Sequence, residues 1–305
     1  MIKIFHRTIK EPTLKELNHI QVGSFVYVEK PTEMEISLLA EKYGLDGGIL
    51  RDARDPYEVP RLEVEDEVIY IFNRLAVTVY DRVETTPILI IYHKDFLMVV
   101  TRAEIPFIER LTTGKQFYTT QKTKVLIQLL AEINRGYNNF LIDISRKVRN
   151  ISINIEEISN QDIARFVHFE SVINDFLSSL VPANGVIVKL LSGRFFKLYE
   201  NDKDLIEDLS LAEKQLIDLC RSTLKTIVNI RSAYSTIMTN NLNRVLKMLA
   251  ALTVVLTIPT IVGSFYGMNV ALPFSDSPKA FAVILALTIL LSVLAMVVFI
   301  KNKWL

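Results

Sequence analysis

The sequence predicts an α+β cytosolic domain followed by a long stalk helix and a two-helix C-terminal transmembrane hairpin. Half of the 305 residues are hydrophobic although 23% are charged, so the apolar residues are unevenly distributed. They gather at the C-terminus, where no charged residue occurs from Met248 to Ser275 or from Ala280 to Ile300. Before them, strand-like patterns give way to helical ones near residue 120.

Residues 1–120 are expected to form a cytosolic α/β domain. The apolar spacing of Glu33–Tyr43 predicts a helix, and runs rich in Val, Ile, Tyr and Phe predict strands. The predicted strands are Ser24–Val28, Val68–Val79, Ile88–Tyr92 and Phe96–Thr101.

Residues 121–201 are expected to form a cytosolic helical region. Apolar residues recur at three- and four-residue steps in Val125–Ile158 and in Ile163–Leu180. Pro182 and Gly185 predict a turn after the second of these helices.

Residues 202–247 predict a long stalk helix. Its apolar residues, from Leu209 to Ile237, lie near one face, and no Gly or Pro interrupts it before Pro259. We therefore expect one helix from Asp202 to Tyr266, about 90 Å long at 1.5 Å per residue. A stripe of this length favours self-association of several copies, although packing on the chain's own helices is an alternative for the lower half.

Two apolar segments, 248–266 and 280–300, are long enough to cross a bilayer, which takes about 20 residues of helix. Residues 267–279 would form the outer loop between them, and 301–305 a basic cytosolic tail. A buried hairpin in a soluble core is the alternative. Two full-length apolar runs side by side favour membrane insertion.

Basic residues predict the orientation of the hairpin. Arg244 and Lys247 precede the first span, and Lys301 and Lys303 follow the second. Lys and Arg near span ends stay preferentially in the cytoplasm. We therefore expect a multi-pass protein of the cell (plasma) membrane, in contact with lipid, with both termini in the cytoplasm.

Hydroxyl residues mark one face of the first span. Thr253, Thr257, Thr260 and Ser264 recur at steps of four, three and four. Close helix packing and hydrogen bonds to the helix's own carbonyls are the ordinary explanations. In a symmetric assembly the same face would line a pore, which a ring of apolar side chains can close by dewetting. The predicted pore and gate residues also include Asn243, Leu246, Leu249 and Ala250.

The first span ends in the motif Tyr266-Gly267-Met268-Asn269. Together with the two spans, the α/β domain, the long helix and the basic tail, this motif resembles the signature of the CorA family of divalent-cation channels. The resemblance covers the whole chain in architecture and is closest over residues 243–269 and the C-terminal tail. It implies a homopentameric, funnel-shaped assembly whose long helices line the pore, with Mg²⁺ as cargo and Co²⁺ or Ni²⁺ as further cargoes. A Zn²⁺ transporter of the same family is an alternative.

The resemblance makes Gly267, Met268 and Asn269 the selectivity filter. Mg²⁺ releases its waters reluctantly. A ring of Asn269 side-chain carbonyls would therefore act as the metal site by accepting hydrogen bonds from those waters, and Gly267 would let the backbone turn tightly.

Two positions depart from the family pattern. Asp276 is the only acidic residue of the loop, where many relatives carry more, so we expect weaker capture of ions outside. Thr257 stands where relatives can place a large apolar gate residue, so closure should depend more on Leu246 and Leu249.

The resemblance further implies that intracellular Mg²⁺, bound between subunits as a regulatory ion, holds the pore shut. The acidic candidates at the start of the stalk helix are Asp202, Asp204, Glu207 and Asp208. Counting back from the matched pore residues favours Asp208, and we assign Asp208 and Asp204 as metal ligands. A solvated helix face is the ordinary explanation of such residues. Transport would be driven by the membrane potential and needs no organic cofactor.

Other classes of function have less support. A net charge of +1 provides no field that would hold nucleic acid. The four histidines have no metal-ligand spacing, and Cys220 lies on the amphipathic helix, where a packing role is expected, so we do not predict an enzyme. The remaining alternative is a membrane-tethered sensor or scaffold without ion flux.

Overall fold

The computed structural model describes residues 1–305 except 12, 81, 154, 156–157, 271, 274–277 and 305. The chain divides into two compact units, Met1–Asn229 and Ile230–Leu305. One continuous helix, α6 (Glu200–Tyr266), contributes residues to both units.

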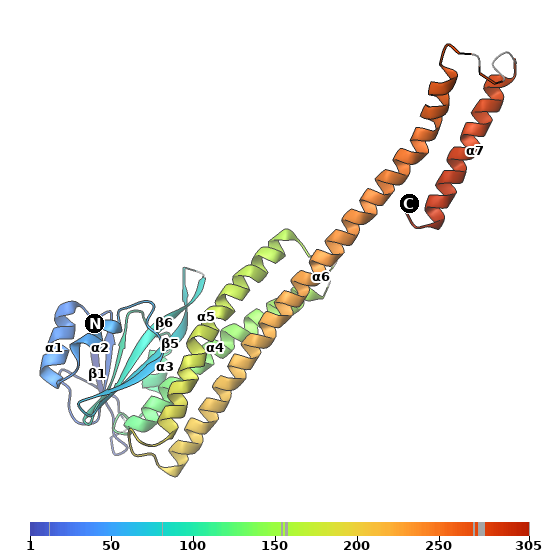
Figure 1. The fold of residues 1–305 in the computed structure, drawn as a ribbon. Helices are drawn as coiled ribbons and strands as arrows, with labels where there is room; N and C mark the ends of the chain where they lie inside the picture. Colours follow the sequence, from blue (N-terminus) through green and yellow to red (C-terminus); the bar gives the residue numbers. More distant parts are fainter. Residues whose placement is uncertain are drawn as a thin grey trace. The chain divides into compact units, whose positions relative to one another are not determined.

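The first unit is built on one mixed sheet (Figure 1). Its strands are β1 (Ile2–His6), β2 (Lys15–Leu17), β3 (Ser24–Glu29), β4 (Arg61–Glu65), β5 (Val68–Val79), β6 (Arg82–Tyr92) and β7 (Phe96–Thr101). They follow the order β2-β1-β3-β7-β6-β5-β4, in which β3 and β7 are parallel and the other neighbours antiparallel. The four central strands are those that the sequence predicts.

Helices cover both faces of the sheet, which explains why its central strands are apolar on both sides. Helices α1 (Glu33–Tyr43) and α2 (Gly47–Asp52) lie on one face, over a core that includes Val26, Val28 and Phe72. The short helix α3 (Ile108–Thr113) follows β7, and α4 (Lys122–Ser152) and α5 (Asn160–Leu191) pack on the other face, in contact with β5 and β6 (Figure 1).

The predicted turn at Pro182 and Gly185 is wrong, because both residues lie inside α5. A proline in a helix interior costs about 3 kcal/mol. The helix continues because its next two turns bury four apolar side chains against the rest of the unit, and burial of each of the three larger ones is worth up to about 1.5–3 kcal/mol. These residues are Ala183, Val186, Ile187 and Leu190.

The expectation of one uninterrupted helix ending at Tyr266 is confirmed by α6. The second apolar helix, α7 (Ala280–Lys301), begins at the first residue of the predicted segment and ends one residue after it. Helix α5 is also long and apolar enough to cross a membrane, but 44% of its apolar stretch is buried in the first unit. In α6 and α7 only 6% of the corresponding stretch is buried, so their apolar surfaces remain exposed.

Candidate functional site

In the second unit, α6 and α7 form a hairpin with one defined contact face. On α6, Ala251 is fully buried, and Val255, Ile258 and Val262 are partly buried. These positions recur at steps of four, three and four. The matching face of α7 contains the buried Thr288 and four partly buried residues, Ile284, Ser292, Ala295 and Phe299.

The hydroxyl stripe of α6 points away from α7. At 100° per residue, the mean direction of the stripe lies about 160° around the helix from the face that contacts α7. Thr253, Thr257, Thr260, Ser264 and Ala250 are all exposed in the chain. The stripe is therefore left for another surface, such as lipid, another copy of the chain or a water-filled space.

Three threonines of the stripe use their hydroxyl protons within the helix. Thr253 Oγ1 donates to the Leu249 carbonyl (2.8 Å), Thr257 Oγ1 to the Thr253 carbonyl (2.7 Å) and Thr260 Oγ1 to the Leu256 carbonyl (3.0 Å). The hydrogen bonds named as an ordinary explanation are thus present. A hydroxyl that donates in this way keeps its oxygen lone pairs. The stripe therefore offers hydrogen-bond acceptors to whatever it faces.

Gly267 ends α6 by a close backbone approach. Its N–H donates to the Gly263 carbonyl at 3.0 Å, and a Cβ added at Gly267 would lie 3.2 Å from that carbonyl oxygen. Gly267 does not have a left-handed φ angle. A side chain at this position would therefore make a tight contact that the Gly263 carbonyl would have to relieve by a shift of a few tenths of an ångström, and no unusual φ angle favours glycine here.

The motif residues after Gly267 are accessible. The side chains of Met268 and Asn269 are exposed, and the Tyr266 hydroxyl donates to the Pro273 carbonyl at 3.4 Å, which ties the helix end to the following loop. Asp276, on which the expected weak capture of ions rests, lies outside the described residues.

Large apolar side chains dominate the other end of the predicted pore face. Leu246 and Leu249 are exposed at 52% and 58%, and Asn243 is exposed one turn before them. This apolar pair is separated from the motif at Asn269 by the hydroxyl stripe. The face therefore changes along α6 from apolar through hydroxylated to amide-bearing.

The acidic residues of early α6 have different surroundings. Asp204, Glu207 and Asp208 are exposed, whereas Asp202 is 3% exposed and its Oδ1 has no hydrogen-bond partner among the described residues. Within the described part of the chain, no three His, Cys, Asp or Glu side chains are grouped so that they could hold a metal ion. The described residues of one chain therefore do not assemble the predicted regulatory site around Asp208 and Asp204.

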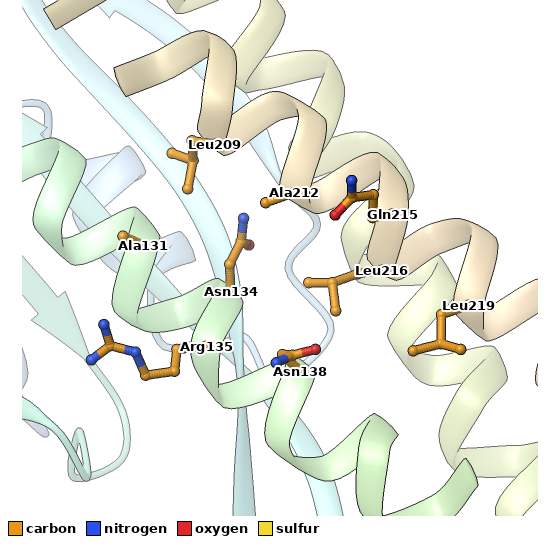
Figure 2. A pocket seen from close by; sticks show the side chains of 9 residues that line it. All are labelled: Ala131, Asn134, Arg135, Asn138, Leu209, Ala212, Gln215, Leu216 and Leu219. Atoms are coloured by element: carbon orange, nitrogen blue, oxygen red, sulfur yellow. The ribbon is translucent and has the colours of Figure 1, made fainter. Parts of the chain in front are cut away.

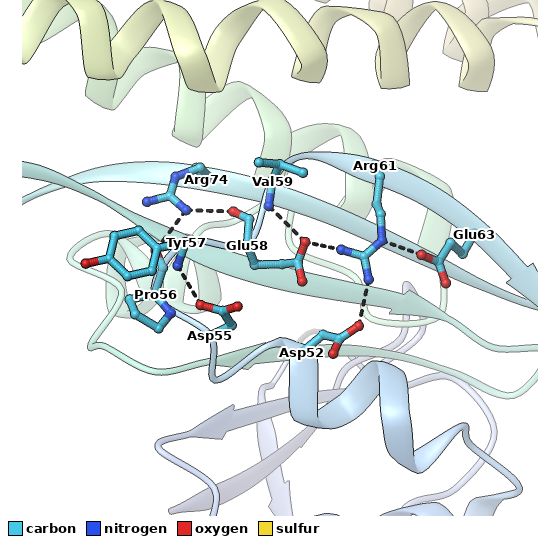
Figure 3. A network of polar contacts seen from close by, with 9 residues as sticks. All are labelled: Asp52, Asp55, Pro56, Tyr57, Glu58, Val59, Arg61, Glu63 and Arg74. Atoms are coloured by element: carbon cyan, nitrogen blue, oxygen red, sulfur yellow. Dashed lines mark hydrogen bonds and ion pairs between the residues drawn. The ribbon is translucent and has the colours of Figure 1, made fainter.

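A second polar cluster in the first unit is structural (Figure 3). Arg61 contacts Glu58 and Glu63 and pairs with Asp52 (Nη2–Oδ2 2.8 Å), and Arg74 donates from Nη1 to the Glu58 carbonyl at 2.6 Å. These contacts hold the segment between α2 and β4 against the sheet. The basic and acidic groups neutralise one another, which is expected of a structural network.

Fold and site define a class of protein: a membrane protein whose α+β domain connects through one continuous helix to an apolar hairpin with a polar face. Residues 21–301 match the family described as CorA-like Mg²⁺ transporter protein. The chain belongs to this family, whose members are transporters of Mg²⁺ or other divalent cations rather than enzymes.

Relatives and solved structures agree with this assignment. The chain is 22% identical to the cobalt/magnesium transport protein CorA of Methanocaldococcus jannaschii, over 97% of this chain and 96% of the relative. The complete structure of the CorA magnesium transporter from that organism matches with a TM-score of 0.89 at 20% identity, over 100% of this chain and 99% of that one. The full-length CmaX protein matches with a TM-score of 0.78 at 12% identity, over 99% and 97% of the two chains. These structures share the fold.

Proposed function

We propose that the chain is a channel-type transporter that admits hydrated Mg²⁺ down the membrane potential, through a pore lined by the hydroxyl stripe of several copies of α6. Co²⁺ and Ni²⁺ are proposed as further cargoes. The observation that carries this proposal is the direction of the stripe, which faces away from α7 and presents oxygen acceptors. A hydrated cation presents water hydrogens outward, so a wall of acceptors suits it.

The proposed assembly is a homo-oligomer, with five copies as the family resemblance implies. Residues 248–266 would line the pore, 267–279 would form the outer loop, and 280–300 would face lipid and the neighbouring helices. Both termini would lie in the cytoplasm, because the basic residues flank the hairpin on that side. Residues 1–120, 121–201 and 202–247 would form the cytosolic α/β domain, the helical region and the stalk.

At the outer mouth, the exposed Asn269 amides would form the filter. Their carbonyl oxygens would accept hydrogen bonds from the waters around the ion, so that Mg²⁺ does not have to lose its hydration shell. The driving force is about 4.6 kcal/mol for a divalent cation at 100 mV, since each charge contributes about 2.3 kcal/mol. Rings of Leu246 and Leu249 would close the pore by excluding water.

Flux into liposomes tests the proposed function. The purified full-length chain is placed in vesicles that contain a Mg²⁺ indicator, under an inside-negative potential. We expect Mg²⁺ uptake that rises with the potential and that protein-free vesicles do not show. Absence of uptake would favour a membrane-tethered sensor, which is the second candidate function. Competition by Co²⁺, Ni²⁺ and Zn²⁺ in the same vesicles compares the candidate cargoes and tests the alternative of a Zn²⁺ transporter.

The proposed regulatory ion provides a further prediction. If intracellular Mg²⁺ binds Asp208 and Asp204 across subunits, it should protect the assembled protein from proteolysis. If bound Mg²⁺ adds about 1.4 kcal/mol to the stability of the folded state, cleavage should be about tenfold slower. We expect Asp208→Ala to reduce this protection, because it removes one of two carboxylates that share a face of α6.

The matched control for that experiment is Asp218→Ala, which removes an exposed carboxylate ten residues further along the same helix. Cleavage is followed with and without Mg²⁺ by gel electrophoresis. Equal Mg²⁺ protection of Asp208→Ala and wild type would exclude Asp208 from the regulatory site.

A further inference from the structure

One carboxyl group lies inside the apolar seam between α6 and the helices α4 and α5. Glu213 of α6 is 1% exposed, and Leu209, Leu216 and Ile217, one turn to either side of it, are buried as well. The next charged residue of the helix, Lys214, is exposed, as expected of a solvated face. A carboxylate in such a position is costly unless a cation or several hydrogen bonds compensate it.

The described surroundings of Glu213 do not compensate a negative charge. Its Oε2 is buried and has no hydrogen-bond partner among the described residues. From α5, the Asn184 amide lies next to the carboxyl, but its Nδ2 also donates to the Ser210 carbonyl (3.1 Å) and to the Ser210 hydroxyl (3.3 Å). The group is therefore more stable as a neutral acid than as an anion.

The other ionisable groups around this seam are neutral or already engaged. Arg135 of α4 lines the cavity between α4 and α6 and forms an ion pair with Glu132. From α4, Tyr137 interacts with Glu213, and its hydroxyl donates to the Arg74 carbonyl at 3.1 Å. Two turns along α6 is the buried Cys220. Burial raises the pKa of both Tyr137 and Cys220, so both stay protonated near neutral pH. The guanidinium of Arg74, on β5, is occupied by Thr85 and by backbone carbonyls.

Burial raises the pKa of Glu213 to about 8, and the neighbouring Asn184 lowers it by less. The unfolded chain has the ordinary value of 4.5. Glu213 is thus protonated in the folded protein at neutral pH. The stability that the neutral form contributes is fully present below pH 4.5 and is lost as the pH rises from there through about 8.

A cavity runs along the same turns of α6 (Figure 2). It has a volume of about 470 Å³ and lies between α4 and α6, where Leu209, Ala212 and Leu216 line it from α6. Asn134 of α4 also lines it, is 6% exposed, and has an Nδ2 without an acceptor among the described residues. The turns of α6 that contain Glu213 therefore border a space with room for water and an unused donor, although Glu213 itself is not among the residues that line it.

We propose that Glu213 is a proton-binding site of the first unit, and that loss of its proton loosens the packing of α6 against α4 and α5. The ligand is the proton itself, and the element that responds is the helix that continues into the second unit. This inference goes beyond the proposed transport function and does not depend on ion flux.

Hydrogen exchange of the full-length protein tests it, with wild type and Glu213→Gln compared at the same pH. At pH 4.5 we expect similar exchange in residues 206–220, because Glu213 is protonated in the folded chain and still about half protonated in the unfolded chain. At pH 9 the wild type should exchange these amides more than about tenfold faster than Glu213→Gln, because only the wild type gains a buried charge between the two pH values. Asp218→Asn, an exposed change on the same helix, should behave as the wild type does.

Two further measurements keep the inference testable. The infrared band of a protonated carboxyl should disappear from the wild type as the pH rises through about 8, and Glu213→Gln should lack this change. If Glu213→Gln does not fold, Glu213→Met supplies an uncharged side chain of similar length for both experiments. Parallel pH profiles in the wild type and the folded variant would overturn the proposal.

Discussion

Asn269→Ala should lower Mg²⁺ uptake into liposomes by more than tenfold. In the proposed filter each amide accepts a hydrogen bond from the hydration shell of the ion, and a hydrogen bond of this kind contributes about 1 kcal/mol. Loss of two such bonds already corresponds to more than about tenfold in rate, since about 1.4 kcal/mol is a factor of ten. Asn269 is exposed after the last turn of α6, so its replacement should not disturb folding.

The control for this experiment is Asn241→Ala. Asn241 is also exposed on α6, but it lies about 130° around the helix from the hydroxyl stripe. The Asn241→Ala variant should therefore transport Mg²⁺ at the wild-type rate. Equal uptake by Asn269→Ala and the wild type would remove the asparagine from the filter, whatever the behaviour of the control.

Thr257→Leu should also reduce uptake by about tenfold or more, because it replaces a hydroxyl acceptor in the middle of the stripe by a larger apolar group. An apolar ring at this level would resist wetting, and the ion would lose acceptors for its waters. Thr257→Val, which keeps the shape of the side chain, should reduce uptake by less. The comparison of the two variants separates the effect of bulk from that of the hydroxyl.

Thr288→Val provides a matched control on α7. Thr288 donates to the Ile284 carbonyl at 2.8 Å, much as Thr257 does to the Thr253 carbonyl, but it lies in the contact face of the hairpin. The Thr288→Val variant should leave Mg²⁺ uptake unchanged. If Thr288→Val lowers uptake as strongly as Thr257→Val, the hydroxyls act through helix packing, and the hydroxyl stripe does not line the pore.

The central part of the fold is predictable because its strands are buried on both faces. Continuous runs of β-branched and aromatic residues identify β5 and β7 to the residue. The edge strands β2 and β4, and β1 next to β2, are short and only partly buried, so their patterns do not stand out from loops. Pro182 misled the prediction because burial of the following turns outweighs the local preference of proline.

The sequence predicts which residues belong to the candidate site, but it does not predict the direction in which they face. The spacing of Thr253, Thr257 and Thr260 defines a stripe, but its direction depends on where α7 packs, which no periodicity within α6 reveals. The sequence also marks the position of Glu213. The apolar stripe of the stalk has a step of seven from Leu209 to Leu216, and Glu213 occupies the omitted position on that face.

The hydrogen bonds inside α6 have a consequence for charge selection. Thr253, Thr257 and Thr260 each commit the proton to a carbonyl of the preceding turn. The polar atoms that such groups present to a conduit would be oxygen acceptors, although none of them carries a formal charge. At the level of these threonines chloride or phosphate would meet oxygen lone pairs, whereas a divalent ion would be attracted without being trapped by a carboxylate.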